Sequence, residues 1–271
     1  MIFNLKVSKS FDLDKTLDCG QCFRWYKKSD SWIGVVLGHI AKVKIKNNLK
    51  NNLLELESEF YDEKFWRSYF DLEFDYEKLK PYFLKFGPVL SDAANENCGI
   101  HILNQEPWEV LCSFIISQNN NIPRIKLIIS RFCEYFGEKS GDIYSFPDYK
   151  TIAKLKIEDL APIKAGFRSK YILDAARRIF NLEINLEKIK AMSTDNALEV
   201  LQLINGVGPK VAACTMLYGF HRFDCFPVDI WIKKVINKYF KNNNNIDFGK
   251  YRGLAQISLF NWSRSHPEFF N

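Results

Sequence analysis

The sequence predicts an α+β protein, with an antiparallel β-sheet in residues 1–95 followed by an all-helical region in residues 96–271. Short runs of aromatic and β-branched residues, separated by turn signals, fill the first part. After about residue 96 the apolar residues recur three or four positions apart, which is the spacing of helices. A length of 271 residues with 47% hydrophobic residues allows one large or two medium domains with a sizeable core.

The first part contains three clear strand patterns, at residues 22–26, 32–37 and 40–45. Turn signals at residues 28–30 and 47–48 separate them. Residues 53–60 fit a strand or a helix, and the pattern leaves both open. Helices are expected at residues 63–70 and 76–86.

The second part contains seven segments with helical spacing and no repeat of 20–50 residues. We expect residues 242–245, a run of asparagines, to form an exposed loop. The expected helices are at residues 109–117, 124–136, 150–155, 170–180, 195–204, 210–220 and 229–240.

Charge and cysteine content narrow the function classes. The formal net charge of +6 is compatible with a polyanionic partner. The 7 cysteines are odd in number and irregular in spacing, and the first residues lack a basic stretch followed by an apolar run. We therefore expect reduced thiols and a cytosolic or nuclear compartment. The sequence has no apolar run of about 18 residues, so no membrane span is expected.

The most informative stretch is residues 201–212. A helix is expected to end near Asn205, Gly206 and Gly208 can take positive φ for a tight reversal, and Pro209 can begin a second helix. This pattern predicts a helix-hairpin-helix whose free amide groups form an anion site suited to a DNA phosphate. A GxG alone is weak, and an ordinary turn between two helices is the plain alternative.

Two residues next to this motif suggest chemistry. Lys210 sits at the end of the hairpin, and Asp229 opens a later helix. Asp229 can cap that helix, and it can also place a carboxylate near Lys210. An amine nucleophile facing a carboxylate suits substitution at C1′ of a nucleotide, where positive charge develops on the sugar.

The segment from Gly206 to Lys210, followed by Asp229, resembles the helix-hairpin-helix Gly/Pro…Asp superfamily of base-excision glycosylases. In that superfamily, members with lysine at the Lys210 position release the base and then nick the strand. The iron–sulfur branch, similar to endonuclease III, carries four cysteines after the catalytic aspartate. No cysteine follows Cys225 here, so that cluster is not expected.

Further segments resemble the eukaryotic-type 8-oxoguanine DNA glycosylase/AP lyase, in the right order over about residues 15–265; they are residues 20–25, 117–124, 166–168, 210–214 and 253–260. The resemblance implies a TBP-like N-terminal sheet and a helix-hairpin-helix glycosylase domain. It implies a monomer without cofactor that binds duplex DNA containing 8-oxoguanine opposite cytosine. The place of action would be the cytoplasmic nucleoid in a prokaryote and the nucleus in a eukaryote.

The resemblance also assigns a base pocket. The carbonyl of Gly20 would accept the N7–H that 8-oxoguanine has and guanine lacks, and an unpaired acceptor rejects guanine. Gln256 would meet the Watson–Crick edge, with Phe260 and Cys214 packed on the two faces of the extruded base. Without the resemblance, these four would be a turn glycine, a surface glutamine and two core residues.

The same resemblance places residues against the duplex. Asn119 would fill the hole left by the extruded base, Arg124 and Arg168 would contact the orphaned cytosine, and Phe167 would wedge beside it. Where the family often has a phosphate-binding histidine this chain has Trp231, whose indole N–H is an alternative donor. The remaining expected contacts to the backbone are Gly206, Gly208 and Val211.

The implied reaction is attack of Lys210 on C1′, loss of the base, a Schiff base and β-elimination, with no metal. Because an ordinary lysine amine is protonated at neutral pH, we expect proton removal to be coupled to substrate binding. The spacing of Cys19 and Cys22 is typical of a zinc site or a redox-active pair, but the sequence has no second close cysteine pair. Two alternatives stay open: a glycosylase of this fold for another damaged base, and a non-catalytic helix-hairpin-helix DNA-binding protein.

Overall fold

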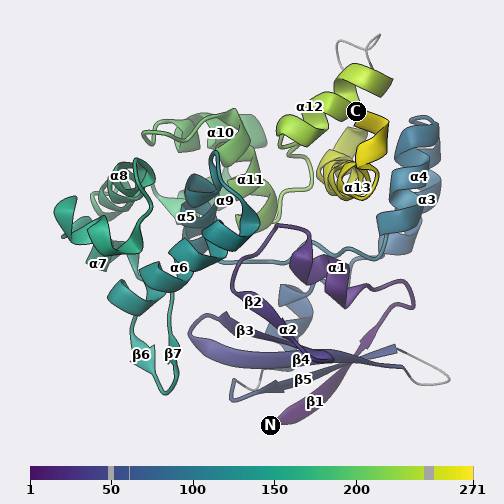
Figure 1. Ribbon diagram of the computed structural model, residues 1–271. Helices are drawn as coiled ribbons and strands as arrows, with labels where there is room; N and C mark the ends of the chain where they lie inside the picture. Colours follow the sequence, from purple (N-terminus) through teal and green to yellow (C-terminus); the bar gives the residue numbers. More distant parts are fainter. Residues whose placement is uncertain (48–51, 61, 241–246, 271) are drawn as a thin grey trace.

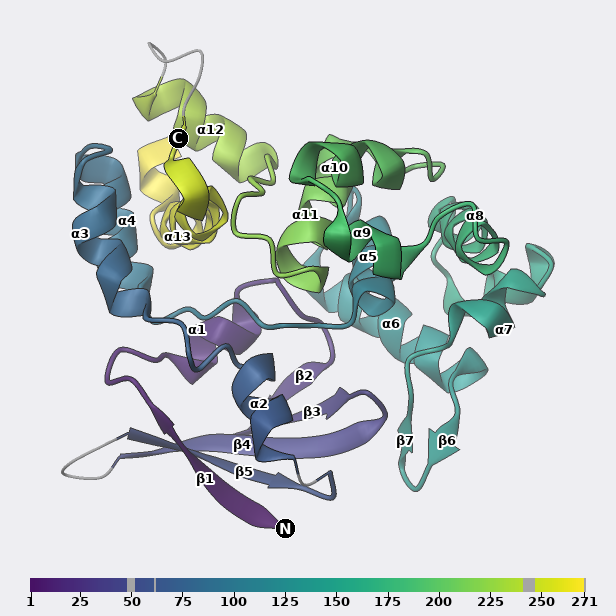
Figure 2. The same cartoon turned by 180° about the vertical axis from the view of Figure 1, so that it is seen from behind.

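The computed structural model describes residues 1–47, 52–60, 62–240 and 247–270, and it confirms the α+β class (Figure 1). A five-stranded antiparallel sheet has the order β1–β5–β4–β3–β2. Its strands are β1 (Ile2–Val7), β2 (Trp25–Lys28), β3 (Ser31–Val36), β4 (His39–Asn47) and β5 (Asn52–Ser58). The helices α1 (Leu13–Asp18) and α2 (Glu63–Tyr69) lie between this sheet and the remaining helices (Figures 1 and 2).

The sheet confirms most of the strand predictions. Residues 53–60, which were open between strand and helix, belong mainly to β5, and Ser29 with φ 54° makes the predicted turn between β2 and β3. The strand predicted at residues 22–26 is wrong at its start, because β2 begins only at Trp25. The side chain of Gln21 bonds the carbonyls of Thr16 and His101 at 2.8 Å each, which holds this segment away from the sheet.

The second part is built from helices joined by short connections. The expectation of an all-helical region is wrong in one detail, a two-stranded hairpin of β6 (Lys139–Ser140) and β7 (Ile143–Tyr144). The α-helices after α2 are α3 (Leu79–Leu84), α4 (Pro88–Asn97), α5 (Pro107–Ser117), α6 (Ile122–Phe136), α7 (Tyr149–Ala153), α8 (Arg168–Phe180), α9 (Leu186–Ala191), α10 (Thr194–Gln202), α11 (Pro209–Gly219), α12 (Ile230–Tyr239) and α13 (Arg252–Ser265). Short 3₁₀ segments are Tyr76–Lys78, Glu158–Ile163, Gly249–Tyr251 and Pro267–Phe270.

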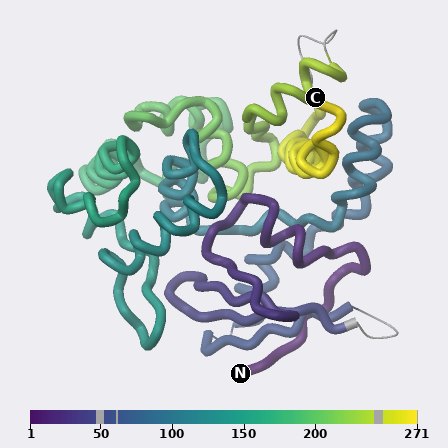
Figure 3. The backbone as a smooth tube through the Cα atoms, in the orientation of Figure 1, coloured from purple at the N-terminus to yellow at the C-terminus, as the bar shows by residue number. Residues whose placement is uncertain are grey.

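These helices form two groups on the same side of the sheet. One group runs from α5 to α11, and the other joins α3 and α4 to α12 and α13, which come from the far end of the sequence (Figure 3). Asn97 on α4 donates to the carbonyl of Ser258 on α13 at 3.4 Å. The division predicted at residue 95 falls inside α4 and stays a prediction.

Two further predictions concern residues at the limits of what is described. The loop predicted at 242–245 lies outside the described residues, and the turn predicted at 47–48 includes residue 48, which also lies outside them.

Among the described helices, none has the length and apolar character needed to cross a membrane.

Candidate active site

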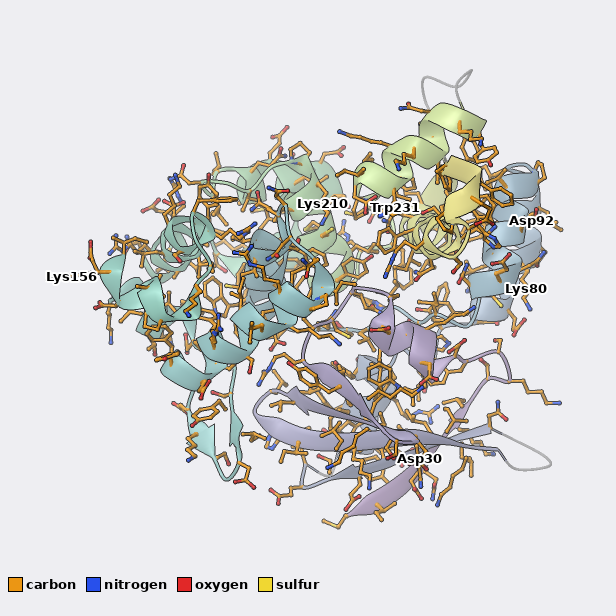
Figure 4. The ribbon with its side chains drawn as sticks, viewed as in Figure 1. Asp30, Lys80, Asp92, Lys156, Lys210 and Trp231 are labelled. Carbon is orange, nitrogen blue, oxygen red and sulfur yellow. The ribbon has the colours of Figure 1, made fainter. Side chains whose placement is uncertain are left out.

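Lys210 and Asp229 line the same pocket, which has a volume of about 660 Å³. Figure 4 shows Lys210 at the start of α11 and Trp231 near the start of α12, so the pocket lies between the two helical groups. Its walls carry Gly20, Phe23, Phe114, Ser117, Gln118, Asn119, Asn120, Asn121, Ile122, Ile125, Lys210, Asp229, Ile230, Trp231, Lys234, Phe260 and Arg264.

The predicted helix-hairpin-helix positions Lys210. The helix α10 ends at Gln202, Pro209 begins α11, and Lys210 therefore lies in the first turn of α11. Gly206 has φ +79°, a conformation that only glycine adopts readily. A Cβ at this position would lie 2.3 Å from the Tyr171 ring on α8, so the hairpin packs tightly against that helix.

The second glycine of the hairpin differs from expectation. Gly208 has φ −92° and ψ −178°, an extended conformation open to any residue, so the positive φ predicted for it is wrong. A Cβ on Gly208 would meet no atom within 4 Å, and the residue is exposed. Gly208 therefore leaves open space at the tip of the hairpin. The reversal of chain direction depends on Gly206, which has the positive φ.

The hairpin leaves backbone donors free. Within the described part of the chain, the amides of Gly206 and Gly208 have no hydrogen-bond acceptor. The first hydrogen bond of α11 runs from the amide of Ala212 to the carbonyl of Gly208 at 3.0 Å. The amides of Lys210 and Val211 come before this bond in the chain, so they have no acceptor within the helix. The Val211 side chain is buried, so only its backbone can serve an anion.

Asp229 is held in place as the cap of α12. Its Oδ1 accepts from the amide of Ile232 at 2.8 Å, which confirms the predicted capping. Burial raises the pKa of Asp229, while this hydrogen bond and the charge of Lys210 act in the opposite direction. No ion pair joins Lys210 and Asp229 among the residues described, so the amine is not locked against the carboxylate.

The amine of Lys210 lies over an aromatic ring. Its Nζ is 4.8 Å from the centre of the Phe114 ring on α5. It also interacts with the thiol of Cys214, one helical turn along α11; burial raises the pKa of this thiol, and the charge of Lys210 lowers it.

The four expected base-binding residues divide into two pairs. Gly20, with φ +86°, and Phe260 line the pocket. Cys214 and Gln256 are buried, with 3% and 4% of their surface exposed, and they do not line it. The Oε1 of Gln256 accepts from the Tyr218 hydroxyl at 3.4 Å.

The expected duplex contacts surround the asparagine-rich loop before α6. Asn119 is exposed and has φ +47°, and Arg124 is exposed in the first turn of α6. Arg168 is buried, and its guanidinium donates to the carbonyls of Gln118 at 2.8 Å and Asn119 at 2.9 Å. Arg168 therefore holds this loop in shape, and its expected contact with cytosine stays a prediction. Phe167 is 49% exposed, with its ring 4.4 Å from the guanidinium of Arg168.

Several pocket residues were not predicted, among them Phe114, Lys234 and Arg264. Phe114 belongs to α5, where almost every side chain is buried, so nothing in the sequence distinguishes it. Lys234 follows Trp231 by three residues and Arg264 follows Phe260 by four. Helical spacing from those two predicted residues was the available signal.

Cys19 and Cys22 are both buried, and each thiol donates to a backbone carbonyl of α1, that of Thr16 at 3.4 Å and that of Leu17 at 3.5 Å. Among the described residues there is no group of three or more side chains placed to hold a metal ion.

Comparison with known proteins gives matches along most of the chain. Residues 4–111 match the family model of the 8-oxoguanine DNA glycosylase N-terminal domain, and residues 112–253 match that of the HhH-GPD superfamily of base excision DNA repair proteins. The structure of MBOgg1 in complex with a low affinity DNA ligand has a TM-score of 0.89 and 38% identity, covering 98% of this chain and 96% of that one.

Two further relatives extend the comparison. The Clostridium acetobutylicum 8-oxoguanine glycosylase/lyase, in complex with dsDNA containing cytosine opposite to 8-oxoG, has a TM-score of 0.85 and 35% identity, and the match covers 98% of each chain. The Saccharomyces cerevisiae N-glycosylase/DNA lyase is 36% identical over 163 residues, which are 54% of this chain and 43% of the yeast protein. The match therefore spans less than half of the length of the yeast protein.

Proposed function

The chain belongs to the HhH-GPD superfamily of base excision DNA repair proteins, in the branch of the 8-oxoguanine glycosylase/lyases, and on that basis we propose that it excises 8-oxoguanine from duplex DNA with Lys210 as the nucleophile. It then acts as a lyase on the abasic strand. Its place of action is the compartment that holds the DNA, the nucleoid or the nucleus.

One observation carries this proposal. Lys210 and Asp229 share a pocket of about 660 Å³ with Gly20 and Phe260. The volume accommodates an extruded nucleotide, and the amine is at the hairpin end, where backbone donors attract the DNA phosphates.

The chemistry follows from these two side chains. The neutral amine of Lys210 attacks C1′ while the bond to the base breaks, and the base leaves with the bonding electron pair and takes up a proton. The carboxylate of Asp229 stabilises the positive charge that develops on the sugar. Ring opening gives a Schiff base between Lys210 and C1′, loss of a proton from C2′ follows, and the 3′ phosphate leaves by β-elimination.

The remaining roles concern recognition. The carbonyl of Gly20 accepts the N7–H of the lesion, and Phe260 stacks on its ring. Their place in the pocket supports these roles. Gln256 and Cys214 are buried, so they reach the base only if it enters fully between the two helical groups.

A second set of residues acts on the duplex. Asn119 fills the gap left by the extruded base, Arg124 faces the cytosine, and Phe167 wedges into the stack. Arg168 contacts the cytosine only if its guanidinium gives up a bond to the loop carbonyls. The half-exposed ring of Phe167 supports that role.

Borohydride trapping on a panel of damaged duplexes tests the proposal. We expect a covalent protein–DNA adduct with an 8-oxoguanine duplex, and none for Lys210→Gln. Weaker or absent adducts with alkylated purines and oxidised pyrimidines would support 8-oxoguanine as the substrate. Equal trapping with an alkylated purine would contradict 8-oxoguanine as the specific substrate. The absence of an adduct with every lesion would refute the proposed lyase activity.

A further inference from the structure

We propose that Lys234 and Arg264 form a phosphate-binding wall on the side of the pocket opposite the hairpin. They bind the phosphodiester groups next to the extruded nucleotide. This inference rests on the proposed function, which it deepens by naming the residues that hold the DNA on the α12–α13 side.

The two cations are placed in the same way on neighbouring helices. Lys234 lies on α12 three residues after Trp231, with its Nζ 5.0 Å from the centre of that ring. Arg264 lies in the last turn of α13 four residues after Phe260, with its Cζ 5.5 Å from that ring. Each helix therefore presents an aromatic ring and a cation to one pocket.

The pocket carries more positive than negative side chains. Its charged side chains are three cations, Lys210, Lys234 and Arg264, and one carboxylate, Asp229. In residues 1–47, 52–60, 62–240 and 247–270, no acidic side chain forms an ion pair with Lys234 or Arg264. An excess of positive charge without acidic partners favours an anionic ligand.

Arg264 also borders a neighbouring hollow of about 600 Å³ that contains Asp14 and Asp18. Asp14 is already engaged, because it accepts from Lys27 at 2.5 Å and from the Trp32 indole at 2.7 Å. Neither carboxylate forms an ion pair with Arg264 within the described ranges. The guanidinium is therefore available to a ligand.

The geometry identifies that ligand as a phosphodiester. The free amides of the hairpin lie at the start of α11, on one side of the pocket, and Lys234 and Arg264 lie on α12 and α13, on the other. An extruded nucleotide has a phosphate on each side, so donors on both walls can hold it. A guanidinium can bind a phosphate through two parallel hydrogen bonds, whereas a lysine acts as a point charge.

Salt dependence of binding tests this wall. In a Lys210→Gln background, which cannot turn over, the affinity for an 8-oxoguanine duplex is measured between about 50 and about 200 mM salt. The slope of log K against log salt is negative, and each lost phosphate contact reduces its steepness by about 0.9. We expect this reduction for Lys234→Ala and for Arg264→Ala, and we expect Arg264→Lys to retain the slope.

The matched control is Lys156→Ala, which removes the same charge from an exposed side chain far from the pocket (Figure 4). Its slope should remain that of the parent. Unchanged slopes for both pocket variants, or an equal loss in the control, would overturn the inference. If Arg264→Ala does not fold, the exposed Lys234 decides the question. Borohydride trapping of the wild-type chain tests the proposed function separately. A failure to form the covalent adduct would be detected independently of the salt dependence of binding.

Discussion

Replacing Asp229 by asparagine removes one negative charge from the pocket and leaves the cap of α12 in place. The Oδ1 of Asp229 accepts from the amide of Ile232 at 2.8 Å, and asparagine caps helices about as well as aspartate. We therefore expect the free energy of unfolding to change by less than about 0.5 kcal/mol. Binding of the lesion duplex should be retained.

The effect on base release should be large. A preorganised group that stabilises developing charge contributes about 3–4 kcal/mol, so the single-turnover rate should fall about 10²- to 10³-fold. Burial raises the pKa of Asp229, and the mechanism needs its ionised form. The wild-type rate should therefore fall with decreasing pH at values above those of an ordinary aspartate, and the variant should lack this limb.

The control is Asp62→Asn, because Asp62 caps α2 through the same kind of bond, from the amide of Phe65 at 3.0 Å, and lies outside the pocket. It should keep the full rate. A rate for Asp229→Asn within about threefold of the wild type would refute the charge-stabilising role, since that corresponds to less than about 1 kcal/mol.

Three further predictions concern the hairpin, a buried carboxyl group and the recognition of the opposite base. Gly206→Ala should lower the free energy of unfolding by at least about 1 kcal/mol, because of φ +79° and the Tyr171 ring, whereas denaturant melts of Gly208→Ala should stay within about 1 kcal/mol. Burial raises the pKa of Glu106 to about 7, so its contribution to stability is present at low pH and is lost as the pH rises through that value. Against Glu106→Gln, the wild type should lose up to about 3 kcal/mol as the pH rises from the ordinary glutamate pKa of 4.5 to about 7, and parallel pH profiles would contradict this. Arg124→Ala should relax the preference for cytosine opposite the lesion, and an unchanged cytosine-to-adenine rate ratio would count against its role.

The pattern of apolar residues predicted most elements, and several of those that it missed have a weak pattern. The helix α13 is buried on nearly all sides, from Gly253 to Leu259, so it shows no amphipathic stripe. The helices α1 and α9 have 6 residues each, too few to establish a period. The strand β1 alternates clearly and could have been predicted.

The site was predictable where local motifs mark it. The hairpin glycine Gly206 and the cap Asp229 have backbone requirements that the sequence displays. Phe114, Lys234 and Arg264 join the pocket only because α5, α12 and α13 pack around it, and no local pattern encodes that packing. For the same reason the buried state of Arg168 could not be predicted, since two of its acceptors, the carbonyls of Gln118 and Asn119, lie 50 and 49 residues earlier in the chain.

The most direct test of the account is to locate the covalent bond. The borohydride-trapped adduct of the wild-type chain with an 8-oxoguanine duplex is digested and sequenced by tandem mass spectrometry. We expect a single modified residue, Lys210, at the start of α11. A modification on Lys234 or any other amine, or strand cleavage by Lys210→Gln at the wild-type rate, would contradict it.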